Sequence, residues 1–397
     1  MRVGIIGVGL LPWKVRYPNK TYYELAAEAV RKALDDAGIG KDRVDNVVYG
    51  LADVYTMAIR QACASTIIQD YIGMAGKSSL TVHGGAATGA LAVKTAYAEI
   101  ASGMSEVSLV VGTGKGMDLI DPETGKRSLG FLKSITFDLD TTWDQPVEPG
   151  ATHFAFVVQA HIDKYGGPTE EQMAKVSVKN HGNALDNPLA QSGIKLTVEE
   201  VLKSPRMSGP AKFYDSCLYS EGAAALVLAN EKIAREIGRK VVWIEGVGSS
   251  NKRSSLPDWD DLGGIPCQYI ATQKAYRMAR IKDPLNELDV IELHDLQTGI
   301  EIMSYEELGL CARGEGGRLI DEGVTERTGR LPVNPSGGMI GCGHVAGPSG
   351  ISRVGEVALQ LRGEAGKRQV KIAHGRGLTA CIGGPGVSQA CSIVLGV

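Results

Sequence analysis

The chain has 397 residues, of which 43% are hydrophobic and 22% charged, and its formal net charge at pH 7 is −3. This length predicts a globular protein with two packed halves, and the absence of a strongly basic run argues against nucleic acid as a partner. No apolar run reaches about 18 residues, so no membrane span is expected. The seven cysteines contain no Cys-X-X-Cys pair, which argues against a disulfide framework or zinc site and predicts a reducing, cytoplasmic setting.

The first part of the sequence alternates strand and helix patterns. The apolar stretch 3–9 predicts a buried strand rather than a signal peptide, because no small-residue cleavage site follows it. A helix is expected from Thr21 to Gly38, residues that are typical of a helix cap and a helix end. The patterns that follow predict a strand at 44–53, a helix at 60–73, a strand at 79–85, an alanine-rich helix at 86–103 and a strand at 107–116.

The second half repeats this order. Residues 240–250 match the first strand, 288–296 match the second, 347–361 match the alanine-rich helix with Ser349-Gly350 on Thr88-Gly89, and 371–377 match the fourth strand. A segment at about 115–237, with helices expected at 152–166 and 170–185, is not repeated. The sequence therefore predicts an α/β protein of two duplicated halves, 1–240 and 241–397, with an insertion in the first.

Three segments of the second half combine glycine turns with reactive side chains. His294 and Asp295 are expected at the end of a strand, His344 before a helix, and Cys381 in a glycine turn before the final strand. Each has a structural alternative, since a buried histidine is often only hydrogen-bonded and a cysteine in such a turn is often only packed. Because strand ends of a duplicated sheet converge at one edge, their joint occurrence favours a functional site.

These motifs, in this order, resemble those of the thiolase superfamily, and of its sterol-carrier-protein type in particular. The sequence ELHDLQT resembles the HDCF motif, NPSGGMIGCGHVAGPSG resembles the NxxGG…GHPxGxxG segment, and CIGG resembles the CxG motif. The resemblance implies the five-layer αβαβα thiolase fold with an inserted loop domain. It also implies a homodimer, a coenzyme A thioester as the substrate and no covalently bound cofactor or metal.

The resemblance further implies roles for individual residues. His344 would activate the nucleophile and form part of one oxyanion hole, His294 would bind the enolate oxygen, and Cys381 would shuttle the α-proton. Backbone N–H groups at Gly85 and Gly383 would complete the oxyanion holes. Trp143, in the loop 137–150, and Gln297 are candidates for the substrate pocket.

The sequence departs from the family pattern at the nucleophile. Aligning HGGAATGAL with the family's NNNCATGSTAL puts Ala86 where the reactive cysteine belongs. Cys63, in QACASTII, imitates a nucleophile motif, but it is expected in the middle of an upstream helix. Leu296 replaces the HDCF cysteine, and Val345 replaces the proline after His344.

Alanine cannot form a thioester, so the acyl-enzyme route is closed in this chain. Three explanations remain: an engineered Cys→Ala exchange, a divergent enzyme that makes or breaks the Cα–Cβ bond of a 3-oxoacyl-CoA or 3-hydroxyacyl-CoA, and a non-catalytic scaffold subunit that binds acyl-CoA. The resemblance also implies a possible accessory subunit with a zinc ribbon and an OB fold, giving a heterotetramer. The lack of a zinc motif in this chain is consistent with a separate partner of that kind.

Overall fold

The computed structural model describes residues 1–52, 55–56, 59–117, 151–237, 240–253, 259–384 and 387–397. Its strands are β1 Val3–Leu10, β2 Asn46–Gly50, β3 Ser78–Val82, β4 Val107–Gly114, β5 Arg206–Ser208, β6 Ala211–Lys212, β7 Gly222–Asn230, β8 Val242–Asn251, β9 Val290–Leu293, β10 Arg376–Gly383 and β11 Gln389–Gly396. Trp143 and the loop that contains it lie outside the described residues.

The α-helices are α1 Tyr22–Ala37, α3 Ala64–Tyr71, α4 Thr88–Ala101, α6 Ala151–Tyr165, α7 Glu170–Ala184, α8 Val198–Lys203, α9 Glu231–Glu236, α10 Pro266–Ala279, α11 Pro284–Glu287, α12 Thr298–Glu307, α13 Gly316–Asp321, α14 Gly338–Cys342 and α15 Pro348–Arg362. Short 3₁₀ turns are η1 Lys41–Arg43, η2 Gly85–Ala87, η3 Phe213–Asp215 and η5 Gly366–Arg368. Within the described ranges, no helix has both the length and the apolar character that a membrane crossing requires.

Nine strands form a continuous sheet in the order β3-β2-β4-β7-β1-β8-β11-β10-β9. The two halves of this sheet meet at a short antiparallel contact between β1 and β8, where Gly4 pairs with Trp243 and Ile5 with Val242. Strands β2, β3 and β4 are parallel to one another, and β9 is parallel to β10. Parallel neighbours place their carboxyl ends at one edge, which is where α/β proteins build sites.

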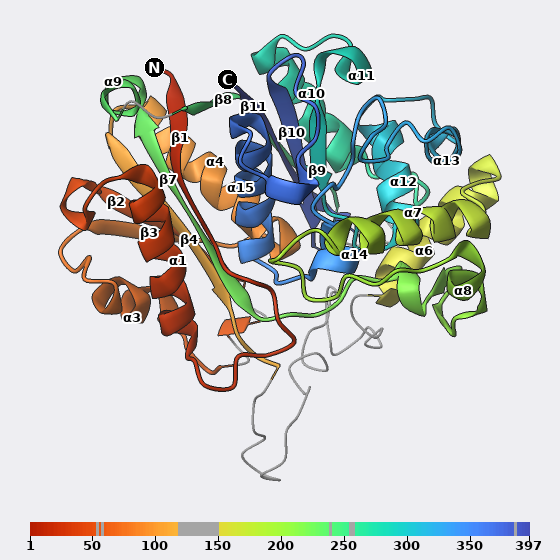
Figure 1. Cartoon of the computed structure of the whole chain (residues 1–397), viewed down its shortest axis with the longest axis horizontal. Helices are drawn as coiled ribbons and strands as arrows, with labels where there is room; N and C mark the ends of the chain where they lie inside the picture. Colours follow the sequence, from red (N-terminus) through yellow and green to blue (C-terminus); the bar gives the residue numbers. More distant parts are fainter. Residues whose placement is uncertain (53–54, 57–58, 118–150, 238–239, 254–258, 385–386) are drawn as a thin grey trace.

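Helices lie on both sides of each half-sheet, and α4 and α15 lie between the halves (Figure 1). One apolar core packs α1 and α3 against the first half, a second surrounds α4 and α15, and a third packs α10 and α12 against the second half. This arrangement is the predicted five-layer αβαβα order. Helices cover both faces of each half-sheet, which explains why most of its strands are buried, whereas the edge strand β3 is partly exposed.

The internal duplication predicted from the sequence is visible in the topology. Strands β1, β2, β4 and β7 have counterparts in β8, β9, β10 and β11, and α4 has its counterpart in α15. The counterpart of β3 is reduced to a single parallel bridge between Val333 and Ile291 of β9. The sequence matches residues 371–377 to the fourth strand, but the counterpart of that strand is β10, which begins only at Arg376. The predicted register of this match is therefore wrong.

Helix α1 shows how the local sequence sets an element's bounds. Thr21 and Glu24 form a reciprocal capping box at its start, and Gly38 ends it in the left-handed conformation with φ of 67°. Such a cap stabilises a helix by about 1 kcal/mol. The helix predicted at 60–73 is shorter than expected, beginning at Ala64, so Cys63 precedes its first turn instead of lying in mid-helix.

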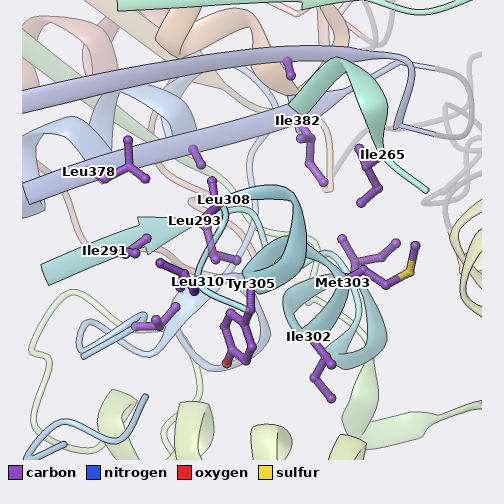
Figure 2. Close-up of a cluster of buried hydrophobic side chains, with 14 of the residues drawn as sticks. Ile265, Ile291, Leu293, Ile302, Met303, Tyr305, Leu308, Leu310, Leu378 and Ile382 are labelled. Carbon is purple, nitrogen blue, oxygen red and sulfur yellow. The ribbon is translucent and has the colours of Figure 1, made fainter. Parts of the chain in front are cut away.

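The third core fixes which face of β10 points toward the centre of the molecule. Figure 2 shows Leu378 and Ile382 of β10 directed into this core together with Leu293 of β9 and Met303 of α12. Because successive strand residues point to opposite faces, Cys381 faces the other way. Its side chain belongs to the central core around α4 and α15.

Candidate active site

The N-terminal ends of α4 and α15 meet in the centre of the protein. A Cβ atom placed on Gly89 would lie 2.1 Å from the carbonyl oxygen of Gly347, so glycine is required for this close approach. A Cβ atom placed on Gly350 would lie 2.6 Å from the backbone nitrogen of Ala90 and 3.0 Å from Cα of Gly89. The paired dipeptides of the two halves, Thr88-Gly89 and Ser349-Gly350, therefore pack on each other.

The two turns that lead into these helices are held by the same hydrogen bond. The N–H of Gly84 donates to Thr88 Oγ1 at 2.9 Å, and the N–H of Val345 donates to Ser349 Oγ at 2.8 Å. In both turns a hydroxyl oxygen fixes the residue four positions earlier. The turn that carries Ala86 and the loop that carries His344 therefore lead into the two packed helices with the same local geometry.

The turn η2, which carries Ala86, also lies against the end of β10. A Cβ atom on Gly383 would lie 2.5 Å from the nitrogen of Ala86, and one on Gly85 would lie 2.6 Å from the nitrogen of Gly384. Gly85 has φ of 52°, a conformation that favours glycine. Ala86 itself is half-buried at the N-terminal end of α4, where backbone N–H groups favour negative charge.

His294 follows β9 and is fully buried. Its Nδ1 lies 3.0 Å from the carbonyl oxygen of Ile382, and its backbone N–H donates to Ala380 at 3.1 Å, so β10 fixes both the ring and the backbone. Its Nε2 is buried and has no hydrogen-bond partner among the described residues. Burial, and then the neighbouring His344, hold the pKa of His294 well below its ordinary value, so the ring is neutral at pH 7.

His344 lies beside it, with the two ring centroids 6.2 Å apart. Its backbone N–H donates to the carbonyl of Leu218 at 2.8 Å, and its carbonyl accepts from Ser220 at 3.0 Å, which ties the loop to the segment leading into β7. Its Nδ1 is buried, and the described part of the chain offers it no hydrogen-bond partner. Burial, and then Arg353, lower the pKa of His344 to about 4. The structure thus brings together two neutral imidazoles, each with a buried ring nitrogen that has no partner in the described chain.

The lowered pKa of His344 predicts a pH-dependent loss of stability. The neutral ring is favoured in the folded state, so its stabilising contribution is complete above the unfolded value near 6.5, declines as the pH falls and is gone below about 4. The expected loss is up to about 3 kcal/mol. Urea denaturation between pH 7 and 4 should show a shallower decline for His344→Gln than for the wild type. Equal slopes for the two proteins would contradict the assigned cause.

Cys381 lies within β10, two residues before its end, and not in the predicted glycine turn. The sequence places the glycines correctly, but the ladder with β11 continues to the pair Gly383 and Gln389. Cys381 is fully buried opposite Cys391. Burial, and then Cys391, raise the pKa of Cys381 well above the ordinary value of a thiol, so it is a protonated thiol at pH 7 and a potential proton donor.

Asp295 connects the His294 strand end to the loop that carries His344. Its carboxyl group accepts hydrogen bonds from the N–H of Met339 at 2.6 Å and from the amide of Asn180 at 2.8 Å. Burial, and then Glu301, raise the pKa of Asp295 to about 8. A Cβ atom on Gly338, which has φ of 61°, would lie 2.1 Å from this carboxyl group. The glycine of the NPSGG stretch is therefore needed to bring α14 onto Asp295.

A second cluster of buried polar side chains joins β9 to α15. Arg353 of α15 donates to Glu292 of β9 at 2.7 Å and to Ser336 at 2.6 Å, and Ser336 donates to Glu292 at 2.8 Å. All three side chains are buried. This group fixes the strand that ends at His294 relative to the helix that follows His344.

Gln297 is buried at the start of α12 and forms an isolated antiparallel bridge with Ser216 of the inserted segment. Its part in a substrate pocket remains a prediction, as does that of Trp143. Sequence reasoning did not find the positioning groups Asn180, Glu292, Ser336 and Arg353. Their only sequence signal is the presence of polar residues within otherwise apolar elements, which does not say which partner each one has.

Comparisons with known proteins agree with this architecture. The family described as "Thiolase, N-terminal domain" matches residues 13–195, and that described as "Thiolase C-terminal domain-like" matches residues 248–396. The acetyl-CoA acetyltransferase of Methanothermobacter thermautotrophicus is 34% identical to this chain, covering 98% of each protein. Sterol carrier protein 2 of Homo sapiens is 32% identical, covering 93% of this chain and 68% of its own length.

Two solved structures share the fold. The Ltp2-ChsH2(DUF35) aldolase has a TM-score of 0.82 at 24% identity, covering 100% of this chain and 98% of its own. The acetyl-CoA acetyltransferase of Syntrophomonas wolfei has a TM-score of 0.73 at 18% identity, covering 100% and 98%. At these identities the similarity concerns the fold alone.

Proposed function

Because the chain belongs to the thiolase family, in its sterol-carrier-protein-type branch, we propose that it makes or breaks the Cα–Cβ bond of a coenzyme A thioester without an acyl-enzyme intermediate. One observation carries this proposal: the turn at Ala86 has no nucleophile, yet two neutral histidines with unpartnered buried nitrogens lie at the adjoining loops. Burying polar atoms without partners costs about 1–3 kcal/mol each, and here two such atoms belong to rings whose centroids lie 6.2 Å apart.

The proposed roles follow from the geometry. Glycine at positions 85 and 383 lets the η2 turn pack closely on the end of β10. Backbone N–H groups at this turn and at the start of α4 would, with His344, stabilise negative charge on the thioester oxygen. Cys381, as a protonated thiol on the same end of β10, would exchange a proton with Cα. With His344 and Cys381, His294 completes the proposed set of three reactive side chains.

We also propose an assembly. In the described chain, β3 bonds only to β2 and leaves its other edge open, with Ser78, Ser79 and Thr81 exposed, so this strand can pair with a second copy of the chain. The similar Ltp2-ChsH2(DUF35) aldolase is named for two components. We propose that this chain likewise binds an accessory protein, one with a zinc ribbon and an OB fold, and that the two form a heterotetramer in the cytoplasm.

Deuterium exchange at Cα tests the proposed function without knowledge of the acyl group. The protein should exchange the α-protons of acetyl-, butanoyl- or phenylacetyl-CoA with D₂O, as measured by mass spectrometry. Cys381→Ser should slow this exchange by about 100-fold or more, since a general acid–base group contributes on the order of 10²–10⁴.

The matched control is Cys391→Ser, which alters an equally buried thiol on the neighbouring strand and should leave the exchange unchanged. The scaffold alternative predicts that these thioesters bind without exchange. Binding without any exchange in the wild type would therefore contradict the enzymatic proposal.

A further inference from the structure

The hydrogen bond of His294 fixes which of its ring nitrogens carries the proton. A backbone carbonyl can only accept, so the contact between Nδ1 and the oxygen of Ile382 at 3.0 Å requires an Nδ1–H group. The ring is neutral, and a neutral imidazole has one N–H only. Nε2 therefore holds a free electron pair. It is buried, and no group of the described chain donates to it.

This tautomer disagrees with the role that the family resemblance implies for His294. Binding an enolate oxygen needs a hydrogen-bond donor, whereas a deprotonated Nε2 is an acceptor. The nitrogen directed away from Ile382 is instead suited to receive a proton. Its location is suitable too, because the next residue after Ile382 is Gly383, which lies against the backbone of Ala86.

We propose that His294 is the general base of this site, that it takes the proton of a β-hydroxyl group through Nε2, and that the substrate is a 3-hydroxyacyl coenzyme A thioester. This inference rests on the proposed function and narrows its substrate class. A 3-oxoacyl thioester has no proton on its β-oxygen, and its cleavage needs a nucleophile that Ala86 does not provide. A 3-hydroxyacyl thioester needs proton transfer alone.

The step balances without another reactant. Nε2 takes the hydroxyl proton, the O–H electron pair becomes the second bond of a carbonyl group, and the Cα–Cβ bond breaks. Its electron pair forms the thioester enolate, whose Cα then takes the proton of the Cys381 thiol, and the His294 imidazolium returns its proton to that sulfur. The products are an aldehyde or ketone and a shortened acyl-CoA.

The tautomer can be measured independently of any substrate. In protein labelled with ¹⁵N-histidine, two-bond ¹H–¹⁵N spectra distinguish a protonated from an unprotonated ring nitrogen, and His294→Gln identifies the resonances. We expect His294 to show Nδ1 protonated and Nε2 unprotonated at pH 7. A protonated Nε2 would overturn the assignment of the base.

The substrate class is tested with matched pairs: 3-hydroxybutanoyl-CoA with 3-oxobutanoyl-CoA, and 3-hydroxy-3-phenylpropanoyl-CoA with its 3-oxo counterpart. We expect aldehyde and acetyl-CoA from at least one hydroxy member and no cleavage of its oxo partner. His294→Gln keeps an N–H donor but lacks the base, so it should lose cleavage by about 100-fold or more while retaining α-proton exchange. Full activity in this variant, or faster cleavage of the oxo members, would contradict the proposal.

His181→Gln is the matched control. His181 is also buried, with Nδ1 against the carbonyl of Ser192, but its ring packs on Tyr214 of the inserted segment. This variant should cleave normally. Exchange without cleavage of any hydroxy member in the wild type would reject the substrate class alone, whereas loss of exchange as well would reject the proposed function.

Discussion

An Ala86→Cys variant is expected to form a covalent thioester with an acyl group, which the chain with alanine at this position cannot form. The new thiol would lie at the N-terminal end of α4, where the helix dipole and free N–H groups lower the pKa of a thiol and stabilise its thiolate. His344, whose ring is neutral, would accept the thiol proton. Thiolysis of 3-oxoacyl-CoA should rise by on the order of 10³-fold or more, because loss of a catalytic nucleophile costs enzymes at least that much.

Intact-mass spectrometry after incubation with acetoacetyl-CoA measures the adduct, and the release of acetyl-CoA measures the rate. Ala86→Ser is the control, since it adds a polar group of similar size that is a far weaker nucleophile. Ala86 is half-buried, so neither variant should change the free energy of unfolding by more than about 0.5 kcal/mol. A folded cysteine variant without an adduct would show that the histidines are not arranged to serve a nucleophile at this turn.

The same variant separates the explanations for the alanine. If the cysteine form thiolyses 3-oxoacyl-CoA and the alanine form cleaves nothing, the alanine replaces a working nucleophile. If the alanine form cleaves a 3-hydroxyacyl-CoA and the cysteine lowers that rate, the site has diverged toward retro-aldol chemistry. The tautomer of His294 favours the second outcome, because a base at Nε2 serves the hydroxyl substrate directly.

Much of the fold could be predicted because its signals are local. The buried strand at 3–9, the capped helix after Thr21 and the repeated order in the second half each need only neighbouring residues. Element ends were less predictable. The glycines after Cys381 predict a turn there, but the pairing of β10 with β11 depends on residues that no short window contains.

The site was predictable only in part, for the same reason. His294 and His344 stand at strand and helix ends that the sequence reveals, and their convergence follows from the topology. What fixes them comes from distant parts of the chain: Asn180 of the inserted segment bonds Asp295, and Arg353 of α15 bonds Glu292. These partners are 115 and 61 residues apart, and neither pair leaves a periodic pattern. The roles of the pairs become visible only in three dimensions.

The Arg353–Glu292 pair predicts the largest effect on stability. Arg353→Met should destabilise the protein by about 3–5 kcal/mol, because it leaves a buried carboxylate without its counter-charge. Burial already raises the pKa of Glu292, and in the variant the carboxyl group should be protonated at neutral pH. The variant should therefore regain part of its stability as the pH falls toward 4.5, where the carboxyl group is protonated in the unfolded chain as well.

The double variant Arg353→Met with Glu292→Gln distinguishes a broken pair from a packing defect. Glutamine keeps an oxygen for the N–H of Ser336 but carries no charge, so the double variant should be more stable than Arg353→Met alone in urea denaturation. Equal stability of the two variants would show that the lost packing of Arg353 dominates. Glu292 lies two residues before His294, and Ser336 lies in the loop leading to His344. The double variant should therefore also have a higher cleavage activity than Arg353→Met alone. In that case the ion pair between Arg353 and Glu292 would set the positions of His294 and His344.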